Sequence, residues 1–422
     1  MGRLTRRTVA LGALGSLGLA GMARGSTSAA ADPLKGSRLY RDVRTYADLG
    51  DHRTGTAGDH ATTDWLINAL APSGYAAKAQ TFDYPVFALN RAELRVGGRS
   101  LSGFPIWTPK ATPPGGIAGP LSLNGGLGTV MLVRLPYNPG ASLRIPAYQI
   151  PIDKALATGA AAVVAVTENP LGELMALNAP AMGPAWSQPV LSVAGREAEI
   201  LRAAVGQPVS VHLVGTTTTG TASNVVATRR RPGQAVVLST PKSGWFRCAG
   251  ERGSGLAIWL GLARWLAAET DHNLVLLATS GHEFDGYGGR RALETFAPTP
   301  AETKLWLHLG ANVAAYGFDQ IEGRLVRQSV PVAQRGVACS SGLIALATQA
   351  FAGQPGYGKP TDIDRDRPPG EVVLYQKMGY SPLIGLVGAH PLHHTPRDLA
   401  DVTAPALLEP VARALKSMLR EL

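Results

Sequence analysis

Five residues in the C-terminal half of the chain are the main candidates to bind a metal ion or move a proton. They are Glu251, His282, Glu283, His308 and His394. A neutral imidazole near pH 7 is a competent general base, and carboxylates and imidazoles are ligands of catalytic zinc sites that keep one position open. If these side chains meet in one cavity, we expect that cavity to bind a divalent ion or to transfer protons.

Alternating strands and helices are predicted to position these residues. Continuous apolar runs indicate strands over 235–239, 274–279, 305–309 and 382–387, and helices over 255–268 and 404–422. Strands that are apolar on both faces belong in a sheet that helices cover on both sides. The predicted fold is therefore an α/β three-layer sandwich with a mostly parallel central sheet. Ligands of such sheets bind at the carboxyl ends of the strands.

The N-terminal half of the chain has a different texture. Helical spacing predicts two helices over 37–49 and 59–70. From 83 to 218 the sequence consists of short β-branched or alternating runs separated by glycine and proline, which is typical of a β-rich domain. We therefore predict that this domain is inserted between two parts of the α/β domain, 32–82 and 219–422.

At the level of motifs, the chain resembles the co-catalytic zinc aminopeptidases (MH clan, metallopeptidase family 28) over roughly residues 35–422. The residues that carry the resemblance are Asn224 to Ala227, Ala249 to Gly255 before an apolar helix, the pair His282-Glu283, His308, and His393 to Asp398. The segment 83–218 resembles the protease-associated domain that is inserted in many secreted peptidases.

The resemblance also implies two departures from the family's metal site. In the family an early strand ends in a His-x-Asp pair, whose histidine binds the first zinc, but residues 239–244 contain neither residue. The aspartate that bridges the two zinc ions in the family falls on Glu251, which is a longer carboxylate.

Four further positions of the family's site fall on residues of this chain. The Glu-Glu pair, general base and then ligand, falls on His282 and Glu283. The following aspartate ligand falls on His308, and the final histidine ligand falls on His394. The resemblance therefore implies a degenerate metal site in which several residue types are changed.

We expect at most one tightly held divalent ion, zinc or another. Two zinc ions need a bridging carboxylate and further protein ligands for each, and the early histidine is missing. The predicted ligands are Glu251, Glu283 and His394, and the predicted catalytic residues are His282, Glu283 and His308. A single zinc held by two carboxylates and one histidine resembles the site of the glutaminyl cyclases.

Two other arrangements of these residues remain open. Glu251 and Arg252 could form a structural ion pair in a site without metal. Alternatively, the three histidines could surround a zinc ion, although neighbouring residues of an extended strand point to opposite faces. Only a turn that begins at Gly281 would let both His282 and Glu283 face inward.

The first 31 residues are typical of an export signal. Arg6-Arg7 precede an apolar, glycine-rich stretch that ends at Met22, and small residues lead to Ala31. The paired arginines favour the twin-arginine route. We therefore expect an exported protein, either extracellular, periplasmic or at the cell surface, that is cleaved near Ala31 and has no membrane association afterwards.

Composition excludes some classes of partner. The chain is 45% hydrophobic and 17% charged, which is enough for a large core, and its net charge is +10. The arginine cluster at 229–231 has no interleaved aromatic residues, so we expect no nucleic-acid partner. Cys248 and Cys339 are too few for a disulfide framework, and whether they pair stays open.

These observations lead to one preferred hypothesis about function and two alternatives. The preferred hypothesis is an exported hydrolase, resembling the zinc aminopeptidases, that acts on a peptide or small amide with at most one divalent metal. The first alternative is a non-catalytic, ligand-binding descendant of that family. The second is a cyclase or transferase that uses one metal ion or none.

Overall fold

The computed structural model of the chain describes residues 32–107, 109–180, 186–322, 324–368 and 370–421. The predicted export signal over residues 1–31 lies outside this part of the chain. None of the helices in the described ranges combines the length and the apolar character that crossing a membrane requires.

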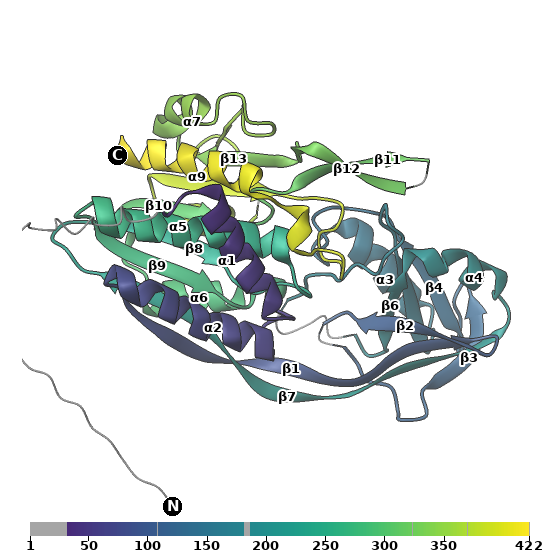
Figure 1. Cartoon of the computed structure of the whole chain (residues 1–422). Coiled ribbons are helices and arrows are strands. Elements are labelled where there is room, and N and C mark those ends of the chain that lie inside the picture. The colour runs from purple at the N-terminus through teal and green to yellow at the C-terminus, as the bar shows by residue number, and fades with distance from the viewer. Residues whose placement is uncertain (1–31, 108, 181–185, 323, 369, 422) are drawn as a thin grey trace, which may run out of the picture. The chain divides into compact units, whose positions relative to one another are not determined.

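A large, mostly parallel sheet forms the centre of the C-terminal part of the chain (Figure 1). Its four central strands are parallel neighbours: β9 (Asn273–Thr279), β8 (Ala235–Pro241), β10 (Thr303–Leu309) and β15 (Leu383–Gly388). Beside them lie antiparallel β7 (Pro208–Arg229) and β13 (Arg335–Cys339), and the short β14 (Thr361–Asp362) pairs parallel with β13. The four strands predicted from apolar runs are therefore confirmed.

Helices cover both faces of this sheet. In β9, Leu274 and Leu276 belong to one apolar core, whereas Val275 and Leu277 belong to the other. The helices of the first core are α1 (Gly36–Asp48), α2 (Ala57–Leu70), α5 (Ser254–Glu269), α7 (Ile344–Ala350) and α9 (Pro405–Arg420), and those of the second are α6 (Tyr287–Thr295) and α8 (Val372–Lys377). Because both faces of each strand are packed, continuous apolar runs were the correct signal, and the predicted three-layer α/β fold is confirmed.

Two long antiparallel strands, β1 (Ala76–Val96) and β7, connect the sheet with the β-rich segment between them (Figure 1). The elements of this segment are β2 (Arg99–Pro105), β3 (Ile117–Ser122), β4 (Val130–Leu135), α3 (Pro146–Ala157), β5 (Ala162–Thr167), β6 (Val190–Ala194) and α4 (Ala198–Ala203). The predicted domain boundaries at 82/83 and 218/219 fall inside β1 and β7, which pair from Ala76 with Thr228 to Val96 with Val209. The resemblance to a protease-associated domain stays a prediction.

A separate hairpin lies between β10 and β13 in the sequence. It consists of β11 (Tyr316–Ile321) and β12 (Arg324–Pro331), which pair with each other and with no other strand of the described ranges.

The loop between α1 and α2 is held by the buried side chain of His52. Its ring stacks on Tyr46 with 3.7 Å between the ring centroids. The Thr62 hydroxyl donates to the carbonyl of Gly58 and therefore accepts from Nδ1 of His52, at 3.1 Å. Burial lowers the pKa of His52 to about 3, so the imidazole is neutral in the folded protein.

We expect this histidine to make the fold sensitive to acid. The folded pKa of about 3 is lower than the ordinary value of about 6.5, so the unfolded chain binds the extra proton below pH 6.5. The stabilisation is present above pH 6.5 and is lost as the pH falls toward 3, at about 1.4 kcal/mol per pH unit. The free energy of unfolding is measured with urea at pH 6.5 and at pH 4.5. Between these two pH values it should fall by roughly 2–3 kcal/mol more in the wild type than in His52→Phe.

The phenylalanine keeps a ring against Tyr46 but removes the titrating group. His60→Gln, which removes an exposed histidine from α2, serves as the matched control and should keep the wild-type pH dependence. Equal pH dependence in the wild type and in His52→Phe would contradict the assignment.

Candidate functional site

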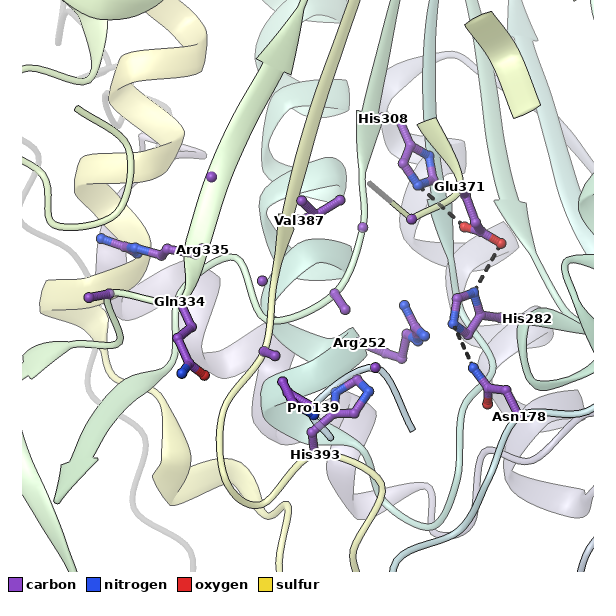
Figure 2. Close-up of a pocket in the computed structure, with 18 residues that line it drawn as sticks. Pro139, Asn178, Arg252, His282, His308, Gln334, Arg335, Glu371, Val387 and His393 are labelled. Carbon is purple, nitrogen blue, oxygen red and sulfur yellow. Dashed lines mark hydrogen bonds and ion pairs between the residues drawn. The ribbon is translucent and has the colours of Figure 1, made fainter. Parts of the chain in front are cut away.

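A cavity of about 660 Å³ opens beyond the carboxyl ends of β10 and β15 (Figure 2). Its wall includes Arg252, His282, His308, Glu371 and His393, and much of the remaining wall is glycine and alanine. This volume lies in the range of small-ligand sites. The position agrees with the rule that ligands of parallel α/β sheets bind at the carboxyl ends of strands.

Glu371 lies between two imidazole rings on this wall (Figure 2). Its Oε1 is 3.0 Å from Nδ1 of His282, and its Oε2 is 3.3 Å from Nε2 of His308. Burial alone would raise the pKa of Glu371, but His282 and His308 lower it well below its usual value. The carboxylate is therefore ionised and holds both rings.

Asn178 determines which nitrogen of His282 carries the proton. Its Oδ1 accepts from Nε1 of Trp245 at 2.8 Å, so its amide nitrogen faces Nε2 of His282, at 3.4 Å. Because an amide nitrogen can only donate, Nε2 of His282 is an acceptor and the ring proton is on Nδ1, next to Glu371. A carboxylate beside Nδ1 and an accepting Nε2 is the arrangement in which serine hydrolases hold their general base; here Nε2 accepts from Asn178.

Ser239 orients the second ring in a similar way. Its Oγ accepts from Nε1 of Trp306 at 2.7 Å and lies 2.9 Å from Nδ1 of His308. The hydroxyl has one proton of its own. When that proton is directed to Nδ1, the ring proton of His308 is on Nε2, where it faces Glu371.

A glycine turn after β9 brings His282 to the cavity. Gly281 has a φ of +84° and begins a 3₁₀ turn over His282–Phe284. A Cβ atom at Gly281 would lie 2.8 Å from the backbone nitrogen of Gly288, so glycine is required both by the backbone angle and by the space. This is the turn without which His282 and Glu283 could not leave the extended strand together.

The same turn directs Glu283 to other partners. Its Oε1 accepts from the backbone nitrogen of Thr54 at 2.7 Å, and its Oε2 accepts from the hydroxyl of Ser243 at 2.6 Å. Burial raises the pKa of Glu283, although these hydrogen bonds oppose the rise. Glu283 therefore fixes the loop before α2 against the segment after β8, and it does not line the cavity.

Glu251 lies in a π-helical turn, Ala249–Gly253, that leads into α5. Asp398 holds this turn by accepting from the backbone nitrogens of Gly250 at 2.7 Å and Glu251 at 2.9 Å. A Cβ atom at position 250 would lie 2.7 Å from Oδ1 of Asp398. Together with Val402, whose Cγ2 lies 2.3 Å from the same Cβ position, Asp398 leaves room only for glycine at position 250.

The Glu251 carboxylate is fully buried and has two cationic or imidazole neighbours. Its Oε1 lies 2.6 Å from Nη2 of Arg252 and 3.2 Å from Nε2 of His394, while its Oε2 has no hydrogen-bond partner among the described residues. Burial would raise the pKa of Glu251, but Arg252 and then His394 lower it well below its usual value. The ion pair with Arg252 that the sequence left open is present.

His394 and His393 differ in where they carry the proton. Nδ1 of His394 faces the carbonyl of Ala176 at 3.0 Å and must donate to it, which leaves Nε2 toward Glu251. The amide nitrogen of Asn312 donates to the carbonyl of Gly388 at 3.0 Å and to Nδ1 of His393 at 2.8 Å. His393 therefore carries its ring proton on Nε2. Burial, followed by the charge of His394, lowers the pKa of His393 well below its usual value.

Glu251, His393 and His394 form a group that could hold a metal ion, since their ligand atoms lie within 4.8 Å of one another. The unpartnered Oε2 of Glu251 fits such an ion. Nε2 of His394 would exchange its contact with Oε1 of Glu251 for the ion, and a histidine whose Nδ1 donates to a backbone carbonyl is typical of metal ligands. However, Arg252 already contacts Oε1, and Nε2 of His393 carries a proton. Because catalytic zinc takes three protein ligands, these residues fit one divalent ion at most.

The predicted site residues therefore fall into three places. Glu251 and His394 are in contact. His282 and His308 are joined through Glu371, and Glu283 is apart from both groups. The predicted ligand and catalytic roles stay predictions, and the structure places His393, which was not among the predicted ligands, beside Glu251 and His394.

Three residues of the site were not identified from the sequence: Glu371, Asn178 and Arg252 as part of the cavity wall. Glu371 immediately precedes α8, and only a glycine and a proline-rich loop before it mark the position. Asn178 belongs to the inserted segment, whose neighbour Ala176 also holds His394. The inserted segment therefore builds part of the site.

Comparison with known proteins places the fold among peptidases. No protein-family model matches the chain. It is similar to a probable lipoprotein aminopeptidase, LpqL, from Mycobacterium tuberculosis, with 27% identity over 314 residues, 69% of this chain and 60% of that protein. The chain thus spans less than two thirds of that relative.

Solved structures give matches along nearly the whole chain. The zinc aminopeptidase BSAP from Bacillus subtilis matches with a TM-score of 0.73 at 15% identity, covering 92% of this chain and 95% of that one. A peptidase M28 precursor from Shewanella amazonensis matches with a TM-score of 0.66 at 14% identity, covering 92% and 95%. An aminopeptidase from Aneurinibacillus sp. strain AM-1 matches with a TM-score of 0.63 at 17% identity, covering 93% and 96%.

Proposed function

The chain has the fold of the zinc aminopeptidases, as the sequence resemblance indicated, and on that premise we propose that it is an exported peptidase-like hydrolase. It hydrolyses a peptide or small amide bond in the cavity beyond β10 and β15. The observation that carries this proposal is the ionised Glu371, which holds two imidazole rings on the wall of that cavity.

His282 is the general base of the proposed reaction. A water molecule replaces the Asn178 amide, which lies 3.4 Å away, as the donor to Nε2, and Nε2 takes a proton from this water as its oxygen attacks the substrate carbonyl. The carbon–nitrogen bond then breaks, and His282 returns the proton to the leaving nitrogen, so that a carboxylic acid and an amine are released. Glu371 keeps the ring oriented and stabilises its charged form, and His308 fixes the other carboxylate oxygen.

A metal ion would add to this chemistry, but the residues present could hold only one. Glu251 and His394 would hold one divalent ion, which would polarise the substrate carbonyl. The guanidinium of Arg252 remains beside that position and neutralises part of the charge of Glu251.

A second candidate function is a peptide-binding protein without catalysis. The observation that favours it is the buried ion pair of Arg252 and Glu251, which places a fixed cation beside the carboxylate that the resemblance implies as a metal ligand. Binding and hydrolysis therefore have to be measured separately.

Metal content separates the proposed ligands from the others. We expect the purified chain, after incubation with zinc, manganese or cobalt and removal of free metal, to retain no more than one ion per chain by elemental analysis. Glu251→Gln and His394→Ala should each abolish binding of the ion, because each change removes one of the two proposed metal ligands. Glu283→Gln should retain it, because the Glu283 carboxylate is bound by Thr54 and Ser243.

The same preparations are then tested for hydrolysis of aminoacyl-4-nitroanilides with and without a chelator. Loss of the ion in Glu283→Gln would reinstate Glu283 as a ligand. A metal-loaded chain that binds a peptide but hydrolyses none of these substrates would overturn the hydrolase proposal in favour of the second candidate.

A further inference from the structure

Arg252 is a cation on the cavity wall that the proposed reaction does not use (Figure 2). Its side chain is fully buried, and Nη2 forms an ion pair with Oε1 of Glu251 at 2.6 Å. Nε, Nη1 and Nη2 have no hydrogen-bond partner with acceptable geometry in the described ranges. A guanidinium has five N–H donors, and buried donors without partners are costly, so this side chain is prepared for an acceptor from outside.

Another buried arginine on the same wall, Arg335, differs from Arg252 in its hydrogen bonds. Arg335 donates from Nε to the carbonyl of Pro355 and from Nη1 to that of Val313, both at 2.9 Å, and it lies over the ring of Tyr357. Two of its nitrogens therefore donate to carbonyls within the protein, whereas the guanidinium of Arg252 has only the ion pair with Glu251 in the described ranges.

We propose that Arg252 binds the carboxylate of a ligand, namely the free C-terminal carboxylate of a short peptide. A planar guanidinium matches a carboxylate with two parallel hydrogen bonds. The cavity of about 660 Å³ has room for a short peptide, and its glycine- and alanine-rich wall leaves space for the backbone. Because the ionised Glu371 and Glu251 lie nearby, a singly charged carboxylate is accommodated better than a doubly charged phosphate.

This inference rests on the proposed function in one respect only: it defines the substrate class as short peptides with a free carboxylate. Glu251 competes with the ligand for the guanidinium. Removing the charge of Glu251 should therefore strengthen carboxylate binding, whereas a purely structural ion pair would show no such gain.

The experiment measures binding without hydrolysis by isothermal titration calorimetry on the full mature chain. The probe is leucyl-glycine whose peptide bond is reduced to CH2–NH, as the acid and as the C-terminal amide. We expect the acid to bind the wild type at least roughly tenfold more tightly than the amide, since charged hydrogen bonds are stronger than neutral ones. Glu251→Gln should increase the preference for the acid.

The charge-balanced pair Glu251→Gln/Arg252→Gln should abolish the preference, and Gln334→Ala, a neutral change on the same wall, should retain it. If the double variant does not fold, Arg252→Lys replaces it in the experiment. Lysine keeps the charge but loses the planar, forked guanidinium, so this variant should show a weaker preference for the acid. Equal affinity of the wild type for acid and amide, binding of neither, or a preference that survives the double change would overturn the proposal. Because the probe cannot be hydrolysed, each of these results is independent of whether the chain is a hydrolase.

Discussion

Replacing Glu371 by glutamine is expected to lower kcat for amide hydrolysis by about 10²–10⁴-fold, with little change in KM. The neutral amide can no longer stabilise the charged form of His282. It can also present a donor instead of an acceptor to Nδ1, which would move the ring proton to Nε2 and remove the lone pair that accepts a proton from water. A purely structural role would change stability without separating kcat from KM.

The measurement is steady-state kinetics together with binding of the reduced leucyl-glycine probe. Glu371→Asp retains the charge and should recover part of the rate, because a carboxylate can still accept from Nδ1 of His282. Glu294→Gln, which removes an exposed carboxylate on α6, is the matched control and should leave the rate unchanged. A Glu371→Gln chain as active as the wild type would remove the two imidazoles and their carboxylate from the mechanism.

The fold could be predicted from the sequence because its strongest signals are local. The strands β8, β9, β10 and β15 are buried on both faces, so each reads as an unbroken apolar run. Glu251 and His308 could be placed for the same reason. Glu251 lies just before an apolar helix, and His308 is near the carboxyl end of a buried strand. Their position relative to the sheet follows from the strand order.

The rest of the site depends on tertiary contacts that leave no local signal. Glu371 comes from the long connection between β14 and β15, and nothing in its neighbouring residues indicates that it meets His282 and His308. Asn178 comes from the inserted segment and is oriented by Trp245. Glu283 shows the opposite case, because its sequence neighbourhood suggests the site but Thr54, from a loop more than 200 residues away, binds its carboxylate.

Lys242 and Asp59 provide the second prediction with a large expected effect. Lys242 lies in the stretch 239–244, where the resemblance implies a metal-binding pair that this chain lacks. Its ammonium forms an ion pair with Asp59, and both side chains have 0% exposure. Asp59 also accepts from the hydroxyl of Ser280 at 2.6 Å and from the backbone nitrogen of Gly55 at 2.9 Å. The position thus links α2 to the ends of β8 and β9.

Lys242→Met is expected to lower the free energy of unfolding by about 3–5 kcal/mol, because it leaves the buried carboxylate of Asp59 without its counter-ion. The double change Asp59→Asn/Lys242→Met should cost less than the single one, since it buries no uncompensated charge. Urea unfolding at neutral pH measures both. Arg202→Met, which breaks an exposed pair with Glu199 at 3.4 Å, is the control and should cost less than about 1 kcal/mol.

Comparing the stabilities of the single and double variants tests whether an ion pair orders the segment where the resemblance implies metal ligands that this chain lacks. Burial lowers the pKa of Lys242, and Asp59 opposes that shift, so the charge of the ammonium depends on its partner. Suppose that Lys242→Met is destabilising and that the double variant recovers part of the lost free energy of unfolding. The fixed ion pair then orders the segment that carries Ser243, and Ser243 in turn holds Glu283. A Lys242→Met chain as stable as the wild type would show instead that this segment is held without the pair, by the backbone hydrogen bond from Lys242 to Thr279 and the contacts of Tyr46.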